Sequence, residues 1–204
     1  MILLYELALK RVWLKPVALN LWISFSKPMK RLILMRHAKT EAWYQGTDDE
    51  GRALLPRGKR DAELVAAELK RRNWLPDHVL ISSARRTRET WTAMQGQFPG
   101  AVHHVREDLY LAGTSALEEA IHRHESAGVL MLLGHNPGIH DLAHGISSRA
   151  GSINQKAALT LAAKMPAAAA ALFERNDLAR SDLDAFKLQD FIIAKKLRPE
   201  EATD

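Results

Sequence analysis

Three short apolar runs along the chain predict buried β-strands. They cover Leu32–Met35, His78–Ile81 and Gly128–Leu133. Their lengths suit strands, and an almost continuous apolar run is typical of a parallel sheet that is covered on both faces. We expect the first of these strands to be central and parallel. A shorter strand is expected at Ala101–Val105.

Amphipathic segments between these runs predict helices. Within Lys59–Asn73 the apolar residues Leu64, Val65 and Leu69 lie on one face, and Pro76-Asp77 then breaks the helix. Three further helices are expected at Arg85–Gln95, at Ser115–His124 with Thr114 or Ser115 as its N-cap, and from the Gly134–Gly138 turn to about Ile146. Strands alternating with helices are the order of a three-layer α/β/α sandwich with a mostly parallel sheet.

The last quarter of the chain is less regular. Ala167–Ala171 is a run of five alanines, which favours a helix by propensity. Asp190–Ala194 has the apolar centre of a strand, and Pro199–Asp204 is expected to be a frayed tail. The chain is therefore divided into an extension at 1–28, one domain at 29–198 and a tail at 199–204.

One edge of such a sheet collects residues that can do chemistry. In doubly wound sheets, ligands bind outside the carboxyl ends of the strands. Three predicted strands are followed there by polar groups, namely Arg36-His37, the turn Ser82–Arg88 and Gly134-His135. Two histidines and several arginines are therefore expected to converge at one place.

Composition excludes several functional classes. The chain of 204 residues has no cysteine, which rules out disulfides, thiolate metal sites and a cysteine nucleophile. The formal net charge is +5, but residues 1–28 hold four basic residues and one acidic residue, so the remaining chain is only +2. Because no long Lys/Arg stripe follows, we expect no nucleic-acid partner. The sequence also has no Gly-x-Ser-x-Gly, P-loop or Gly-x-Gly-x-x-Gly motif.

Residues 1–28 are rich in Leu, Trp and Val, with basic residues between them. Their longest uncharged run, Pro16–Ser26, is shorter than the roughly 20 residues that a membrane span needs. Three interpretations are open: an interfacial amphipathic segment, an extra helix packed on the domain, or sequence upstream of a natural start at Met29. We favour the third, and we expect a cytoplasmic protein without a stable membrane span.

The residue types at the sheet edge suit phosphoryl transfer without a metal ion or a cofactor. Such transfer needs a nucleophile in line with the leaving group and positive charge on the equatorial oxygens. A neutral imidazole such as His37 can be the nucleophile, and the planar fork of Arg36 can meet two phosphate oxygens at once. Arg85, Arg86 and Arg88 open a predicted helix, whose N-terminal amides also favour an anion.

Four motifs, in order, resemble the histidine phosphatase superfamily, which is related to cofactor-dependent phosphoglycerate mutase. Leu34–Thr40 resembles its Arg-His-Gly/Ala signature, in the form of the SixA-type phosphohistidine phosphatases. The other motifs are Asp49–Leu54 with Gly58, Ser82–Thr90, and Leu132–Gly138, which ends in Gly-His-Asn-Pro-Gly. The resemblance covers roughly residues 30–146 and implies a phosphoglycerate mutase-like fold.

The resemblance also implies roles for individual residues. His37 is the implied nucleophile, Arg36 and Arg86 bind the phosphoryl oxygens, and His135 donates a hydrogen bond to the phosphate. Arg86 is chosen over its neighbours because it lies four positions before Thr90. Further substrate contacts are expected from Lys39, Arg52, Arg85 and Asn136.

Three departures from the family pattern bear on the substrate. Ser83 replaces a proline in the second turn. Leu111 stands where an acid that protonates the leaving group is expected, with Glu107 and Asp108 just upstream. The alanine run stands where the family has a strand of mixed composition. We therefore expect a strand there, as the resemblance implies, rather than the helix that propensity favours. A missing acid is tolerable when the leaving group is good, as a protein imidazole is, and this favours phosphohistidine on a protein.

The expected partner is thus a phosphorylated protein, either a histidine-containing phosphocarrier or a phosphotransfer domain. Arg86 and His135 are only 49 positions apart, which leaves no room for a long cap and predicts an open site, and Trp43 lies in a loop that can line it. The alternatives are a small-molecule phosphomonoesterase of the same superfamily and a phosphohistidine-binding module without turnover. His140 and His144 share a helical face, but without a third ligand a packed or solvated pair is favoured over zinc.

Overall fold

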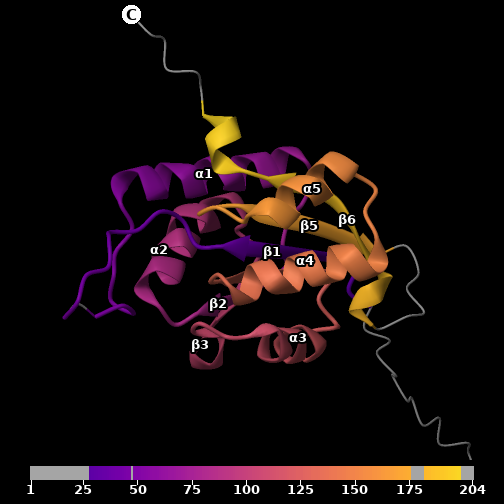
Figure 1. Cartoon of the computed structure of the whole chain (residues 1–204), viewed down its shortest axis with the longest axis horizontal. Helices are drawn as coiled ribbons and strands as arrows, with labels where there is room; N and C mark the ends of the chain where they lie inside the picture. The colour runs from indigo at the N-terminus through magenta and orange to yellow at the C-terminus, as the bar shows by residue number, and fades with distance from the viewer. Residues whose placement is uncertain (1–27, 47, 176–181, 199–204) are drawn as a thin grey trace, which may run out of the picture.

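A six-stranded sheet forms the centre of the protein (Figure 1). The computed structural model describes residues 28–46, 48–175 and 182–198, so nearly all of the extension at 1–28 and the whole tail at 199–204 lie outside the described residues. The strands are β1 Arg31–Arg36, β2 His78–Ser82, β3 Val102–Arg106, β4 Val129–Gly134, β5 Ala170–Arg175 and β6 Phe186–Ile192. Their order across the sheet is β3-β2-β4-β1-β5-β6.

The first four strands of the chain run parallel to one another. β5 pairs antiparallel with β1, and β6 pairs antiparallel with β5. The prediction of a mostly parallel sheet is therefore confirmed. Because β6 is reversed twice relative to β1, it points the same way, and its carboxyl end reaches the same edge of the sheet.

Helices cover both faces of the sheet and make three layers. They are α1 Pro56–Arg71, α2 Arg85–Met94, α3 Thr114–His122, α4 Gly138–Ala150 and α5 Gln155–Ala163. α1 and α2 pack on one face, and α3, α4 and α5 pack on the other (Figure 1). The predicted three-layer α/β/α class is thus confirmed.

The side chains of β1 explain why its apolar run is continuous. Leu32 and Leu34 enter the core under α3, α4 and α5, whereas Ile33 and Met35 enter the core under α1 and α2. All four are fully buried, and burial of such a side chain contributes about 1.5–3 kcal/mol. A strand between two helical layers needs apolar residues at every position, as predicted.

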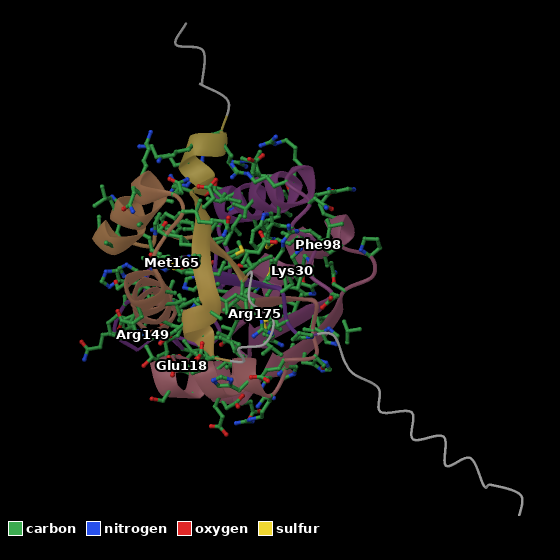
Figure 2. All side chains as sticks on the ribbon, turned by 90° about the vertical axis from the view of Figure 1, so that its right-hand side faces the viewer. Lys30, Phe98, Glu118, Arg149, Met165 and Arg175 are labelled. Carbon is green, nitrogen blue, oxygen red and sulfur yellow. The ribbon has the colours of Figure 1, made fainter. Side chains whose placement is uncertain are left out.

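Figure 2, turned by 90°, shows polar residues that join neighbouring elements within a layer. Arg149 of α4 lies beside Glu118 of α3, with 3.7 Å between Nη2 and Oε1. Arg175, at the end of β5, lies beside Lys30, and its backbone N–H donates to the Lys30 carbonyl oxygen at 3.1 Å. Neighbouring elements are therefore fixed to one another by polar contacts at the rim of the apolar core.

Several helix ends differ from the prediction. α1 begins at Pro56, because proline suits the first turn of a helix, where its missing N–H costs nothing. It ends before Pro76, because Asn73 takes a φ of 59° and so lets the next N–H return to the carbonyl oxygen of Leu69. The N-cap of α3 is Gly113, without a side-chain cap, so the prediction of Thr114 or Ser115 there is wrong.

The C-terminal region contains one confirmed strand, one misplaced strand and one helix that was missed. Ala170 and Ala171 start β5, so the strand implied by the family resemblance forms in place of the helix favoured by propensity. β6 ends at Ile192 and a 3-10 helix starts at Ala194, so the strand predicted for Asp190–Ala194 was placed too late. α5 was not predicted, although Asn154 caps it by accepting from the N–H of Ala157 at 3.0 Å.

Candidate active site

A crevice opens where the chain leaves β1 and β4 in opposite directions. β1 leads to α1 on one face of the sheet, whereas the neighbouring β4 leads to α4 on the other face. Arg36 and Gly134 pair at the ends of these strands, and the N–H of His37 donates to the Gly134 carbonyl oxygen at 3.1 Å. His37 and His135 therefore start side by side, at the topological switch point where ligands bind in doubly wound sheets.

His37 is held in a single tautomer. Its Nδ1 lies 2.8 Å from the carbonyl oxygen of Ala38, and a carbonyl oxygen can only accept a hydrogen bond, so Nδ1 carries the proton. This leaves the lone pair of Nε2 as the nucleophilic position of the ring. The ring centroid lies 5.2 Å from that of His135.

The surroundings of His37 keep its ring neutral. The pKa of His37 is lowered to about 3. Burial is the largest cause, the cations Arg36, Arg86 and Arg52 act in the same direction, and the hydrogen bond to Ala38 acts in the opposite direction. His37 is only 8% exposed. At neutral pH its Nε2 is therefore unprotonated and able to attack.

Arg86 lies in the first turn of α2 and is buried, with its guanidinium in the crevice. Its Nη2 donates to a carboxylate oxygen of Asp49 at 3.0 Å, its Nη1 donates to the Asp49 carbonyl oxygen, and its Nε donates to Nδ1 of His135 at 3.3 Å. Tyr110 stacks on it at 5.7 Å from the ring centroid. These contacts fix the orientation of the guanidinium before any anion arrives.

Both ring nitrogens of His135 have partners. Because Nδ1 accepts from Arg86, Nε2 carries the proton and donates to Oγ of Ser82 at 2.7 Å. Burial, followed by the proximity of His37 and Arg86, lowers the pKa of His135 to about 3. In this arrangement the ring has no hydrogen left for a phosphate.

Asp49 and Tyr110 belong to the site, although neither was predicted to have a role in it. The Asp49 carboxylate also accepts from the Tyr110 hydroxyl at 2.7 Å and forms an ion pair with Arg52 at 2.7 Å. Burial acts to raise the pKa of Asp49, but the Tyr110 hydrogen bond and the charges of Arg86 and Arg52 outweigh it, so the pKa lies below its usual range. The only signal was the place of Asp49 in the acidic stretch before Arg52.

These groups surround a cavity of about 440 Å³, called here the Arg86 cavity. Six of the eight predicted site residues line it: Arg36, His37, Arg52, Arg86, His135 and Asn136. Nη1 of Arg36 donates to the Met165 carbonyl oxygen at 3.0 Å, and its buried Nε has no hydrogen-bond partner in the described structure. Asn136 donates to the same carbonyl oxygen at 3.0 Å, and a cis peptide bond joins it to Pro137. The cavity therefore has cationic donors on two sides of His37.

Two predicted substrate-binding residues lie elsewhere. Arg85 is exposed, forms an ion pair with Glu89 at 2.7 Å and does not line the Arg86 cavity. Lys39 is exposed and lines a neighbouring groove that also contains Arg36 and His37. The structure thus does not bring Arg85 to the site, and it places Lys39 at the rim.

Leu111 lines the Arg86 cavity where an acid was expected. Asp108 forms an ion pair with Arg106, and neither it nor Glu107 reaches the cavity. Trp43 lines the cavity from its loop, as anticipated. Asp49 is therefore the carboxylate of this cavity.

The pair His140 and His144 has partners other than a metal. Nε2 of His140 donates to the Leu161 carbonyl oxygen at 2.7 Å, and Nε2 of His144 lies 3.4 Å from Oγ of Ser148. Within the described ranges, no group of three or more His, Asp or Glu side chains is placed to hold a metal ion. No helix in that part of the chain is long and apolar enough to cross a membrane.

Comparison with known proteins identifies the family. The family model of the histidine phosphatase superfamily (branch 1) matches residues 32–110, which include Arg36, His37, Asp49 and Arg86. An uncharacterized protein of Mycobacterium tuberculosis is 34% identical over 119 residues, 58% of this chain and 73% of that protein. This chain belongs to the histidine phosphatase superfamily. The first three of the four motifs lie within the matched residues.

Two further relatives place the chain within the superfamily. A structure assigned as phosphohistidine phosphatase SixA from Agrobacterium tumefaciens is 26% identical, with a TM-score of 0.67, and the alignment covers 81% of this chain and 98% of that chain. An uncharacterized chloroplastic protein of Arabidopsis thaliana is 35% identical over 129 residues, 58% of this chain. The match spans only 59% of the Arabidopsis protein. The superfamily member described here is thus similar to the SixA-type branch.

Proposed function

We propose that this histidine phosphatase hydrolyses phosphohistidine on a protein through a covalent phosphohistidine at Nε2 of His37. The observation that carries the proposal is the hydrogen bond from Nδ1 of His37 to the Ala38 carbonyl oxygen. It leaves an unprotonated Nε2 between the guanidinium groups of Arg36 and Arg86, which is what in-line attack on a phosphoryl group requires.

The first step transfers the phosphoryl group to the enzyme. Nε2 of His37 forms a bond to phosphorus while the bond between phosphorus and the substrate imidazole breaks. The leaving nitrogen takes up a proton from water in the open cavity. Arg36 and Arg86 hold the equatorial oxygens, where negative charge is greatest in the transition state.

The second step releases inorganic phosphate. A water oxygen attacks phosphorus, the bond to Nε2 of His37 breaks, and that nitrogen regains its lone pair. Asp49 takes the proton of the water, because a carboxylate with a lowered pKa is ionised and suits a base better than an acid. It then releases this proton to solvent, which replaces the proton that the leaving imidazole took from water in the first step. Asp49 lines the same cavity as His37, which puts it within the reach of such a water.

The lining of the cavity supports phosphohistidine rather than a phosphate ester. Leu111 occupies the place of the expected acid, and an alkoxide leaves poorly without one. An imidazole leaves without that help. Among the described residues no long insertion covers the cavity, so a side chain presented by another protein can enter it.

The decisive experiment compares substrates and a matched pair of variants. The protein is incubated with a phosphorylated histidine-containing carrier protein, with phosphoimidazole and with a panel of phosphate esters. We expect turnover of the first two, an acid-labile phosphoryl group trapped on His37, and no effect of EDTA. His37→Ala should abolish turnover, whereas His122→Ala, at an exposed histidine that lines neither the cavity nor its neighbouring groove, should not. Turnover of esters alone would replace the protein substrate by a small molecule, and binding without release would make the protein a phosphohistidine-binding module.

A further inference from the structure

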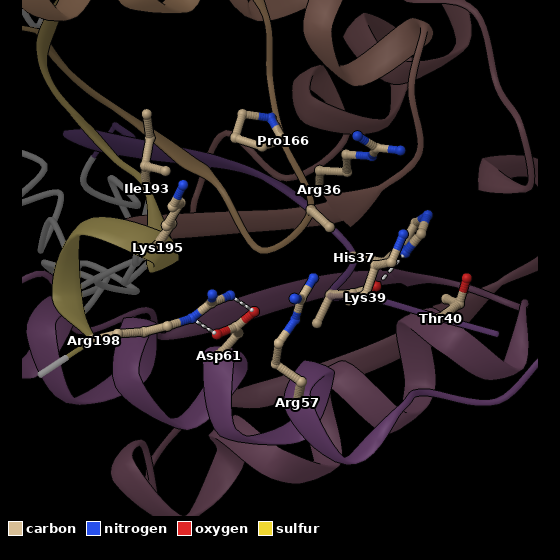
Figure 3. Close-up of a pocket in the computed structure, with 12 residues that line it drawn as sticks. Arg36, His37, Lys39, Thr40, Arg57, Asp61, Pro166, Ile193, Lys195 and Arg198 are labelled. Carbon is tan, nitrogen blue, oxygen red and sulfur yellow. Dashed lines mark hydrogen bonds and ion pairs between the residues drawn. The ribbon is translucent and has the colours of Figure 1, made fainter. Parts of the chain in front are cut away.

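A second hollow adjoins the Arg86 cavity (Figure 3). It has a volume of about 470 Å³, and Arg36 and His37 line both spaces. The other polar residues of this hollow, called here the basic groove, are Lys39, Thr40, Arg57, Asp61, Lys195 and Arg198. A ligand that reaches His37 from the Arg86 cavity can therefore continue into the basic groove.

The basic groove carries a large excess of positive charge. Its single acidic residue, Asp61, is buried, and both of its carboxylate oxygens accept from Arg198, at 2.8 and 2.7 Å. That bidentate pair neutralises the carboxylate. In the described part of the chain, Lys39, Arg57 and Lys195 form no ion pair with any carboxylate. Their charges are thus available to an anionic ligand.

The cations reach the basic groove from separate parts of the chain. Arg57 comes from the first turn of α1, Lys39 from the loop after β1, and Lys195 from the 3-10 helix Ala194–Leu197 after β6. Figure 3 shows Arg57 and Lys195 rising on different sides of one space, with the Asp61–Arg198 pair between their elements. The groove is therefore charged along its length and not at a single point.

We infer that the basic groove binds an acidic stretch of the phosphorylated protein substrate, next to its phosphohistidine. This rests on the proposed function, because it assumes that the phosphohistidine enters the Arg86 cavity. An extended chain advances about 3.3–3.6 Å per residue, so side chains a few positions from the phosphohistidine reach the groove.

The exposure of the cations favours a protein surface over a second phosphate group. Lys39, Arg57 and Lys195 are all exposed on flexible side chains, unlike Arg86, whose guanidinium is buried and fixed by Asp49. A single phosphate is held best by convergent, preorganised donors. Exposed and dispersed cations instead attract an acidic surface and speed its association.

The test compares two phosphohistidine peptides, one flanked by Asp and Glu and the other by Asn and Gln at the same positions. At low salt the acidic peptide should have a several-fold higher kcat/KM, and the ratio should fall toward one at about 0.5 M salt. Arg57→Glu or Lys195→Glu should lower the ratio by about 2- to 10-fold. Phosphoimidazole lacks the flanking carboxylates, so its kcat/KM should change in either variant no more than that of the Asn/Gln peptide does.

Lys70→Glu is the matched control. Lys70 is exposed on the same helix as Arg57, about 20 Å away along its axis, and it does not line the groove. The same charge reversal there should leave the peptide ratio unchanged. Equal kcat/KM for the two peptides, or a ratio that Arg57→Glu and Lys195→Glu do not alter, would overturn the inference. So would a preference for small bisphosphates over monophosphates without a preference between the peptides.

The two proposals can fail separately. Without turnover of phosphoimidazole by the wild-type protein, the proposed function fails. The groove is then judged from the dissociation constants of the same peptides with unmodified histidine. Tighter binding of the acidic peptide, weakened by Arg57→Glu and not by Lys70→Glu, supports the groove whatever the chemistry is.

Discussion

Oγ1 of Thr90 accepts a hydrogen bond from the backbone N–H of Ala38 at 3.0 Å, and its hydroxyl donates to the Arg86 carbonyl oxygen at 2.6 Å. One buried hydroxyl thus joins the residue that follows His37 to the helix that carries Arg86. This contact sets the position of the nucleophile relative to a guanidinium group that is 49 residues further along the chain than His37.

Thr90→Val should therefore affect both stability and catalysis. Valine has the same shape but leaves the fully buried Ala38 N–H without an acceptor, which costs about 1–3 kcal/mol of the free energy of unfolding. We expect kcat for phosphoimidazole to fall about tenfold, because small displacements of a nucleophile are costly. Thr90→Ser keeps the acceptor and should retain most of the activity. Wild-type kcat in the valine variant would show that the contact does not position His37.

Ser82 should control the proton of His135. The implied donation from His135 to the phosphate needs the proton on Nδ1. This tautomer becomes available if the N–H of Arg86 Nε turns from Nδ1 toward the phosphate and the Ser82 hydroxyl turns to donate to Nε2. Ser82→Ala removes that donor, so kcat should fall by about 10- to 100-fold, with a smaller change in KM. The ¹⁵N shifts of His135 with bound vanadate report the tautomer. If they show Nε2 protonated in the wild-type complex, His135 does not donate through Nδ1.

Acid should destabilise the protein through its two site histidines. An unfolded histidine has a pKa of about 6.5, whereas burial lowers the pKa of His37 and of His135 to about 3 in the folded chain. Below pH 6.5 the unfolded chain therefore binds protons that the folded chain does not bind. The contribution of these two neutral histidines to the free energy of unfolding is fully present above pH 6.5, and it is lost as the pH falls toward 3. Between pH 7 and 5 the loss should be about 2 kcal/mol for each histidine.

Urea unfolding at pH 7 and pH 5 measures this loss. The variant His135→Gln should lose about 2 kcal/mol less than the wild type over the same interval, because one titrating group is gone. An equal loss in both proteins would mean that His135 is not held neutral by the fold.

Gly58 lies where α1 passes over the loop that follows His37. A Cβ atom at this position would lie 2.1 Å from the carbonyl oxygen of Lys39, so Gly58→Ala must push the helix or the loop away. We expect a loss of about 1–3 kcal/mol in stability together with a lower kcat. Gly96→Ala is the control, since nothing lies within 4 Å of its Cβ position. If Gly58→Ala has the free energy of unfolding and the kcat of the wild type, the loop after His37 can move aside without cost.

The pattern of apolar and polar residues predicted those strands and helices that are determined by residues close together in the sequence. The apolar run of β1 identified a central strand, and the order of the motifs placed His37, Arg86 and His135 at one edge of the sheet. Both Arg85 and Arg86 were predicted to contact the substrate, because they are neighbours in the sequence. On a helix, however, that step is a rotation of about 100°, so Arg86 enters the crevice and Arg85 faces solvent.

Other parts of the site depend on contacts between distant segments. Asp49 lies in an irregular loop, and its role follows from Arg86, Arg52 and Tyr110, which surround it only after folding. The basic groove likewise needs Lys195 to reach His37 from the far end of the chain. No periodic pattern in the sequence predicts such contacts, because they form only when whole helices, strands and loops pack together.

The direction of β6 brings part of the basic groove from a stretch of sequence that carries none of the reacting groups. The strands that end in the reacting groups are complete by Gly134, while β6 returns to the same edge and delivers the residues around Lys195 and Arg198 beside them. If the basic groove binds the substrate protein as inferred above, substitutions in these segments change its selectivity without altering the nucleophile. A descendant of this protein could thus change the charge of its groove through substitutions after β6 while the residues around His37 stay the same.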